Sequence, residues 1–149
     1  MIWLLRHGEA ADGSPDAERP LTEKGERQSR AAGAALKALG VELAVCLTSP
    51  KVRAYDTARL ACEPLGAEPS HEPRLSGGPI DPEQLAAGLE DGDVLLVGHD
   101  PDLSMAVHTM TGAQVRMKKG GLAGVERGEL KVLLRPHETA AIAAADGDG

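Results

Sequence analysis

The chain has 149 residues, of which 42% are hydrophobic and 26% charged, so its composition suits one packed domain over residues 1–149 and excludes wholesale disorder. Acidic residues outnumber basic ones by 23 to 16, which gives a formal net charge of −7 with neutral histidines. This balance argues against a nucleic-acid-binding protein, and one Trp, one Tyr and no Phe leave little on which bases could stack. A few arginines can still create a local anion-binding pocket.

The cysteines and the apolar segments favour a cytoplasmic protein. Cys46 and Cys62 form no CxxC pair and have no histidines at zinc-ligand spacing, so we expect two free thiols in a reducing compartment. The opening residues lack the basic region and the long apolar run of a secretory signal, and no stretch is long enough to span a bilayer. We therefore expect no membrane partner.

The first apolar run predicts a buried strand. Residues 2–5 are apolar and stop abruptly at Arg6. After a polar loop, Thr22 can cap a helix that ends at Gly40. Gly25 weakens the first turns of that helix, which indicates close packing or a nearby ligand.

The middle of the chain continues the alternation of strands and helices. Residues 43–48 form a second apolar run, and residues 52–62 predict a helix that Pro64 stops. Residues 67–79 are rich in proline and glycine, so we expect a loop with at most a short edge strand. A short helix is expected over residues 81–89, where an N-cap aspartate precedes a proline.

The last third of the chain holds the clearest strand. Residues 94–97 are fully apolar and are expected at the centre of the sheet, before a helix that residues 100–101 cap and Gly112 ends. An antiparallel hairpin is expected from residues 123–125 and 130–134, and residues 140–149 are expected to form a frayed tail. The whole pattern predicts an α/β fold, a three-layer sandwich with a mostly parallel central sheet.

Polar, chemically capable residues follow three of the predicted strands. The first strand leads into Arg6 and His7, the second into Ser49 with Arg53 shortly after it, and the central one into His99. Ligands of parallel sheets bind beyond the carboxyl ends of the strands, near helix N-termini that favour anions. Taken singly, each residue can be a solvated or structural side chain. Together, two guanidinium groups and two imidazoles suit a phosphoryl group.

The remaining basic residues have simpler interpretations. His71, His108 and His137 lie off the apolar faces or in loops, so we expect all three to be solvated. Lys118 and Lys119 precede two glycines, and we expect a solvated turn there, with a secondary contact for an acidic partner as the alternative.

Several segments in order resemble the histidine phosphatase superfamily, which includes the phosphoglycerate mutases. Residues 4–10 are similar to its N-terminal RHG signature, and residues 19–28 to the segment after it. Residues 49–58 resemble the block with the second arginine, and residues 97–101 the block with the second histidine. The form of residues 97–101 and of residues 118–123 looks most like the SixA-like phosphohistidine phosphatase branch.

The resemblance implies a phosphoglycerate mutase-like fold and a role for each matching residue. His7 would be the nucleophile and would form a covalent phosphohistidine intermediate. Arg6, Arg53 and His99 would hold the phosphoryl oxygens. The chemistry needs positioning and charge neutralisation, which fixed positive groups supply, so we expect no metal and no other cofactor.

The sequence departs from the family pattern at the leaving group. Many members carry an acidic residue in the stretch that corresponds to residues 74–78, where this chain has no carboxylate. Glu9, Glu83 or Asp100 could substitute. A departing imidazole needs less help from an acid than an alkoxide does, so we expect hydrolysis of phosphohistidine on a partner protein. The alternatives are a phosphomonoesterase for a small phosphorylated metabolite and a non-catalytic phosphoryl-binding module, against which an intact His7 argues.

Overall fold

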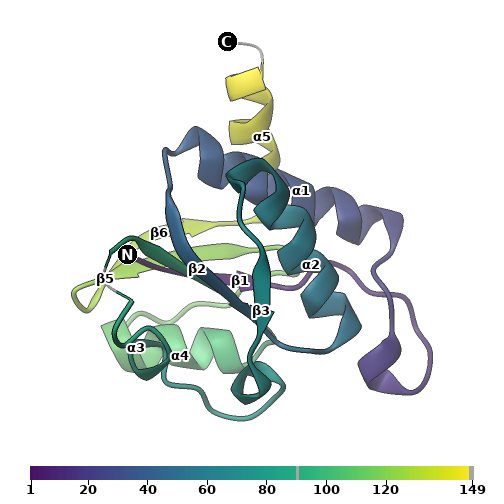
Figure 1. The fold of residues 1–149 in the computed structure, drawn as a ribbon, viewed down its shortest axis with the longest axis horizontal. Helices are drawn as coiled ribbons and strands as arrows, with labels where there is room; N and C mark the ends of the chain where they lie inside the picture. Colours follow the sequence, from purple (N-terminus) through teal and green to yellow (C-terminus); the bar gives the residue numbers. More distant parts are fainter. Residues whose placement is uncertain (90, 148–149) are drawn as a thin grey trace.

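A six-stranded sheet forms the middle layer of the protein in a computed structural model that describes residues 1–89 and 91–147 (Figure 1). The strand order is β3-β2-β4-β1-β5-β6, with parallel pairing from β3 to β1 and antiparallel pairing from β1 to β6. The strands are β1 (Ile2–Arg6), β2 (Leu43–Thr48), β3 (Pro69–His71), β4 (Asp93–Gly98), β5 (Leu122–Glu126) and β6 (Glu129–Leu134). The expected mostly parallel sheet with a C-terminal hairpin is confirmed.

Helices cover both faces of this sheet and complete the three layers (Figure 1). They are α1 (Glu23–Ala38), α2 (Val52–Cys62), α3 (Pro82–Leu85), α4 (Asp102–Thr111) and α5 (Pro136–Gly147). The helices α1 and α2 lie on one face, whereas α3 and α4 lie on the other. Within the described residues, none of the helices has both the length and the apolar character that crossing a membrane requires.

Alternating side chains of the central strands build a separate core on each face. Trp3 and Leu5 pack with Val97 under α1 and α2, while Leu4 and Leu96 pack with α3 and α4. Burying one such leucine side chain contributes about 1.5–3 kcal/mol to stability. Because β1 and β4 are covered on both faces, their apolar side chains pack into one core or the other, which explains their continuous apolar runs. The cysteines of β2 and α2 are free, as expected, and both are buried in the first of these cores.

The first helix begins and packs as its sequence predicts. The Thr22 side chain accepts a hydrogen bond from the backbone N–H of Gly25, at 3.0 Å, and so caps α1. The third helix is shorter than expected, because it ends at Leu85 and the chain turns through Gly88, whose φ is 83°.

The prediction of a frayed tail is wrong for residues 140–147, which belong to α5. Alanine is the strongest helix former and fills much of this segment. The Glu138 carboxylate accepts a hydrogen bond from the Arg135 backbone N–H, at 2.9 Å, and Thr139 is buried. The helix packs against α1, and its last turns project from the body of the protein (Figure 1). Residues 148–149 lie outside the described residues.

Candidate active site

The strands β2, β4 and β1 are neighbours in the sheet, and their carboxyl ends lie side by side. Arg6 ends β1 and His7 follows it, while His99 follows the last residue of β4. Ser49 follows β2, and Arg53 lies in the first turn of α2. Parallel pairing therefore brings together residues that are far apart in the sequence.

The two histidines and two arginines lie close enough at this edge of the sheet to interact electrostatically. The ring centroids of His7 and His99 are 5.2 Å apart. Their side chains are largely enclosed, since His7 and His99 are each 8% exposed and Arg53 is 7% exposed. The positive charges of Arg53 and Arg6 both bear on the His7 imidazole, and Arg53 also bears on His99. The geometry thus places all four predicted side chains in one cluster.

One hydrogen bond determines which nitrogen of His7 is free to react. His7 Nδ1 lies 2.7 Å from the carbonyl oxygen of Gly8. A carbonyl oxygen can only accept, so Nδ1 carries the proton and Nε2 carries the free lone pair. Burial, with the nearby charges of Arg53, Arg6 and Lys119, lowers the pKa of His7 from 6.5 to about 4, although the bond to Gly8 opposes this shift. Near neutral pH, the His7 imidazole is therefore uncharged, and the lone pair of Nε2 is free.

The backbone beside His7 is held by α1 and α2. The N–H of Gly8 donates to Thr57 Oγ1 at 3.0 Å, and Thr57 Oγ1 in turn donates to the Arg53 carbonyl at 2.7 Å. A Cβ on Gly25 would lie only 2.0 Å from the carbonyl oxygen of Glu9. The glycine in the first turns of α1 is therefore explained by close packing, one of the two expected reasons.

Two buried nitrogen atoms of the cluster have no protein partner. His99 Nε2 lies 2.8 Å from Ser49 Oγ, and Arg6 Nη1 donates to the Met117 carbonyl at 2.8 Å. In the part of the chain that the structure describes, Arg6 Nε and His99 Nδ1 are buried without a hydrogen-bond partner. Such unpaired groups are rare in native proteins, and both can bind the oxygens of a ligand.

The second histidine is also uncharged near neutral pH. Burial, followed by the charges of His7, Arg53 and Lys51, lowers the pKa of His99 from 6.5 to about 3. The imidazole of His99 therefore serves as a hydrogen-bonding group, and the arginines supply the lasting positive charge of the cluster.

Asp16 is a further residue of this region, and sequence reasoning missed it. Arg53 Nη1 donates to the Asp16 backbone oxygen at 2.8 Å, and Arg53 Nη2 donates to the Asp16 carboxylate at 3.1 Å. Hydrogen bonds from Arg19 and Arg53 hold the pKa of Asp16 below its usual range. Asp16 thus orients the Arg53 guanidinium. Nothing in the sequence spacing predicts this contact, because it depends on the path of the loop before α1.

The three candidate acids lie in different places. Asp100 caps α4, since its carboxylate accepts hydrogen bonds from the N–H of Ser104, at 3.0 Å, and from the Ser104 hydroxyl. Glu83 lies beside the first residues of β1, at the opposite end of that strand from Arg6. Glu9 forms an ion pair with Lys24 at 3.7 Å. Asp100 directly follows His99 and Glu9 lies two residues after His7, so of the three only Glu83 lies away from the cluster.

The remaining histidines are exposed, which confirms the expectation for His71, His108 and His137. A group of three or more His, Cys, Asp or Glu side chains that could hold a metal ion does not occur among residues 1–89 and 91–147. The donors of the cluster, imidazole and guanidinium groups, suit an oxyanion.

The fold and the cluster together define a class of protein: an α/β domain whose strand ends carry a group of side chains suited to an oxyanion. Residues 2–77 match the family profile described as histidine phosphatase superfamily, branch 1. The chain belongs to the histidine phosphatase superfamily.

Individual relatives extend the match over most of the chain. An uncharacterized protein of Picosynechococcus sp. strain PCC 7002 is 35% identical, over 88% of this chain and 87% of its own. The structure of the protein histidine phosphatase SixA complexed with tungstate is 26% identical, covers 91% of this chain and 97% of its own, and has a TM-score of 0.75. A SixA-type structure from Agrobacterium tumefaciens shares the fold at a TM-score of 0.77 and 22% identity, with 91% of this chain and 97% of its own covered. The resemblance to the SixA-like branch and the expected phosphoglycerate mutase-like fold are thereby confirmed.

Proposed function

We propose that this protein is a phosphatase that hydrolyses phosphohistidine on a partner protein, without a metal ion, through a phosphorylated His7. The observation that carries the proposal is the state of His7, which is buried and neutral, with Nδ1–H donated to Gly8 and Nε2 unprotonated. Membership of the superfamily and the likeness to a protein histidine phosphatase support it.

In the first step, His7 Nε2 attacks the phosphorus of the substrate. A P–N bond forms to His7, and the P–N bond to the substrate imidazole breaks. The leaving imidazole takes the bonding electrons and departs neutral, because its distal nitrogen already carries a proton. Arg6 and Arg53 neutralise the phosphoryl oxygens, and the Gly8 carbonyl stabilises the positive charge that develops on the His7 ring.

In the second step, water attacks the phosphoryl group on His7 from the side that the leaving imidazole has vacated. A P–O bond forms and the P–N bond to His7 breaks. The electrons return to Nε2, and both protons of the water stay with the product, which leaves as dihydrogen phosphate. His7 thereby regains its neutral form, and the cycle is complete.

The carboxylates around the cluster favour phosphohistidine over alkyl phosphate esters. An alkoxide leaving group requires a proton from an acid, whereas an imidazole protonated at its distal nitrogen does not. Asp100 is engaged in capping α4, and Glu9 is paired with Lys24. Residues 74–78 contain no carboxylate. We therefore expect slow turnover of sugar and glycerol phosphates.

The test compares a phosphohistidine peptide, a phosphoserine peptide and glycerol phosphate as substrates. We expect the phosphohistidine peptide to have the highest kcat/KM, and His7→Ala to lower kcat by roughly 10³-fold or more. Arg53→Ala should also lower kcat/KM strongly, and intact mass should show one phosphoryl group on the wild type that His7→Ala lacks. Faster turnover of glycerol phosphate would instead indicate a small-molecule phosphomonoesterase. Binding without turnover would indicate a phosphoryl-binding module.

A further inference from the structure

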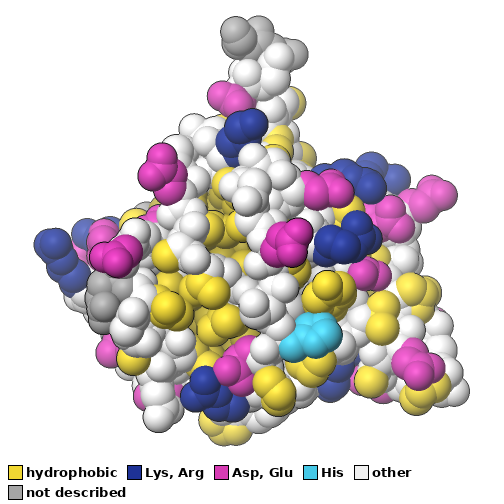
Figure 2. All heavy atoms as spheres, viewed as in Figure 1, with side chains coloured by type: hydrophobic (Ala, Val, Ile, Leu, Met, Phe, Trp, Pro, Cys, Tyr) yellow, Lys and Arg dark blue, Asp and Glu magenta, His cyan; other side chains and the backbone are white. Residues whose placement is uncertain are grey.

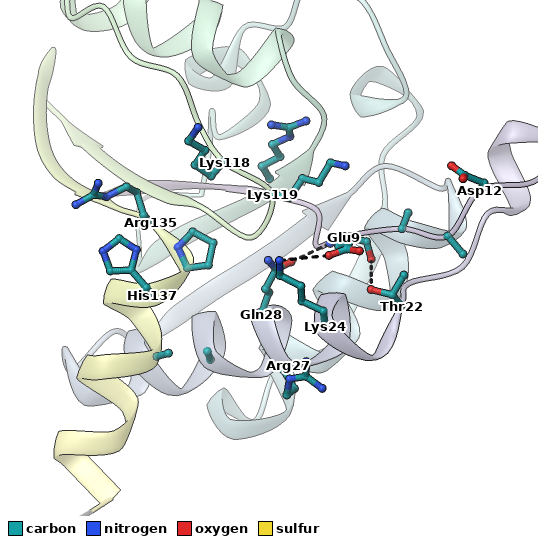
Figure 3. Close-up of a pocket in the computed structure, with 16 residues that line it drawn as sticks. Glu9, Asp12, Thr22, Lys24, Arg27, Gln28, Lys118, Lys119, Arg135 and His137 are labelled. Carbon is teal, nitrogen blue, oxygen red and sulfur yellow. Dashed lines mark hydrogen bonds and ion pairs between the residues drawn. The ribbon is translucent and has the colours of Figure 1, made fainter.

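Arg6 of the cluster also lines a wide groove. Figure 3 shows this groove in close-up. Its volume is about 1270 Å³, and its walls come from three places in the chain. The start of α1 forms one side, the turn before β5 with Lys118 and Lys119 forms the other, and the start of α5 with Arg135 and His137 closes one end (Figure 3). Small-molecule sites measure roughly 300–1,000 Å³, so this groove has room for a stretch of polypeptide.

The walls of the groove carry an excess of positive charge. Lys24 is paired with Glu9, and Arg135 is paired with a glutamate of α5. Arg27, Lys118 and Lys119 are exposed, and none of the three has an ion-pair partner within the described part of the chain. Glu9 and Asp12 are the two carboxylates of the lining. With Arg6 at the edge of the cluster, the excess of positive charge extends from the groove to the nucleophile.

This charge is local, because the chain as a whole has a net charge of −7. On the face seen in Figure 2, acidic and basic side chains are interspersed among hydrophobic ones. A positive groove in an acidic protein attracts a negatively charged segment to one place and repels it elsewhere. A nucleic acid extends far beyond a short groove and would also meet the remainder of the chain, where acidic residues outnumber basic ones, so it fits this distribution less well than a short acidic peptide segment.

The turn that bears the two lysines is fastened to the backbone of the cluster. The N–H of Gly120 donates to the carbonyl oxygens of Arg6 and His7, at 3.0 Å each, and the Arg6 N–H donates to the Gly121 carbonyl, at 3.0 Å. A Cβ on Gly120 would lie 2.8 Å from the Cβ of Gln28, so at this point the turn packs directly on α1. The backbone that carries Lys118 and Lys119 is therefore held at a fixed position relative to His7, and little order must be created in this turn on binding.

We propose that this groove docks an acidic segment of the phosphorylated partner protein, adjacent in that partner to the phosphohistidine. The inference rests on the proposed function, because it specifies which class of phosphohistidine protein binds at the same site. Arg27 and Lys118 bind the acidic side chains of the partner from opposite walls, and Arg6 connects the groove to the phosphoryl group.

The test uses phosphohistidine peptides of equal length whose flanking residues are glutamate, alanine or lysine. We expect kcat/KM at low salt to be at least about fivefold higher for the glutamate peptide than for the alanine peptide, and lowest for the lysine peptide. The ratio should shrink at 0.5 M salt, because screening weakens exposed charge pairs. Equal kcat/KM for the three peptides would overturn the inference.

Charge-reversal variants locate the effect. Arg27→Glu and Lys118→Glu should each bring the glutamate-to-alanine ratio towards one. The matched control is Lys37→Glu, which makes the same change of charge at an exposed position of α1 outside the groove and should preserve the ratio. A ratio that survives both groove variants, or falls equally in the control, contradicts the assignment of this surface. Lys119 is left unchanged in these variants because its charge acts on His7.

A binding measurement separates the two proposals. Peptides with a non-hydrolysable phosphonotriazole in place of phosphohistidine are titrated with the wild type, and fluorescence anisotropy gives their Kd. If the enzyme hydrolyses no phosphohistidine peptide, the proposed function fails. The docking proposal is still supported if the glutamate peptide binds more tightly than the alanine peptide and Arg27→Glu abolishes this difference. Equal Kd values for the glutamate and alanine peptides overturn the docking proposal.

Discussion

Mild acid should destabilise the protein through the histidines of the cluster. The pKa of His7 is about 4 in the folded protein, whereas an unfolded chain has the ordinary value of 6.5. Above pH 6.5 the imidazole is neutral in both states. Between pH 6.5 and 4 the unfolded chain binds a proton that the folded protein does not, so the free energy of unfolding falls as the pH falls.

The size of this effect follows from the shift. One pKa unit corresponds to about 1.4 kcal/mol, so His7 alone removes about 3 kcal/mol of stability between pH 6.5 and 4, and about 2 kcal/mol between pH 7 and 5. His99, whose pKa is lowered to about 3, acts in the same direction. A loss of this size is a large fraction of the stability of an ordinary domain, which is about 5–15 kcal/mol.

Urea unfolding at a series of pH values from 7.5 to 5 measures the effect. We expect His7→Asn to make the free energy of unfolding less dependent on pH than in the wild type, whatever its stability at pH 7. The control is His108→Gln, because His108 is exposed and should leave the pH dependence unchanged. The reasoning is refuted if wild type and His7→Asn lose stability equally on acidification.

Two further predictions concern the backbone that holds the nucleophile. In Gly25→Ala the new Cβ would lie 2.0 Å from the Glu9 carbonyl oxygen, so we expect a stability loss of about 1–3 kcal/mol and at least a tenfold lower kcat. The control is Gly33→Ala, whose Cβ would lie 2.2 Å from a carbonyl oxygen of α2 and which should lose stability but keep its kcat. Equal loss of kcat in both would contradict this. Thr57→Val leaves the Gly8 N–H without its acceptor and should cost about 1–3 kcal/mol in urea unfolding, with lower kcat, while Thr57→Ser should retain both. A valine variant as active and as stable as the serine variant would show that this bond is dispensable.

The central strands and main helices could be predicted because their signals are local. Continuous apolar runs such as residues 94–97 indicate strands covered on both faces, and Thr22 caps α1 through a contact three residues away. The cluster was predicted by adding a topological rule, since parallel strands bring Arg6, His7 and His99 to one edge. The end of the chain was mispredicted because its last glycines and aspartates were weighed above the preceding alanines of α5.

The parts that could not be predicted depend on where loops lie in space. Asp16 reaches Arg53 only because residues 11–20 fold back over the start of α2, and no sequence spacing determines that path. Thr57 belongs to a segment that resembles the family, yet its acceptor role for Gly8 appears only when the strand ends and α2 are packed together. The groove likewise depends on where α5 packs against α1, which no local pattern in the sequence determines.

The division of charge within the cluster explains how two histidines and two arginines can share one small space. Burial keeps both imidazoles neutral near pH 7, so the positive charge around a bound phosphoryl dianion would come from Arg6 and Arg53, with the ammonium groups of Lys51 and Lys119 nearby. A protonated His7 would add attraction for the dianion but would have no lone pair for the attack. The same desolvation that should make the protein sensitive to acid thus keeps the Nε2 lone pair of His7 available at neutral pH.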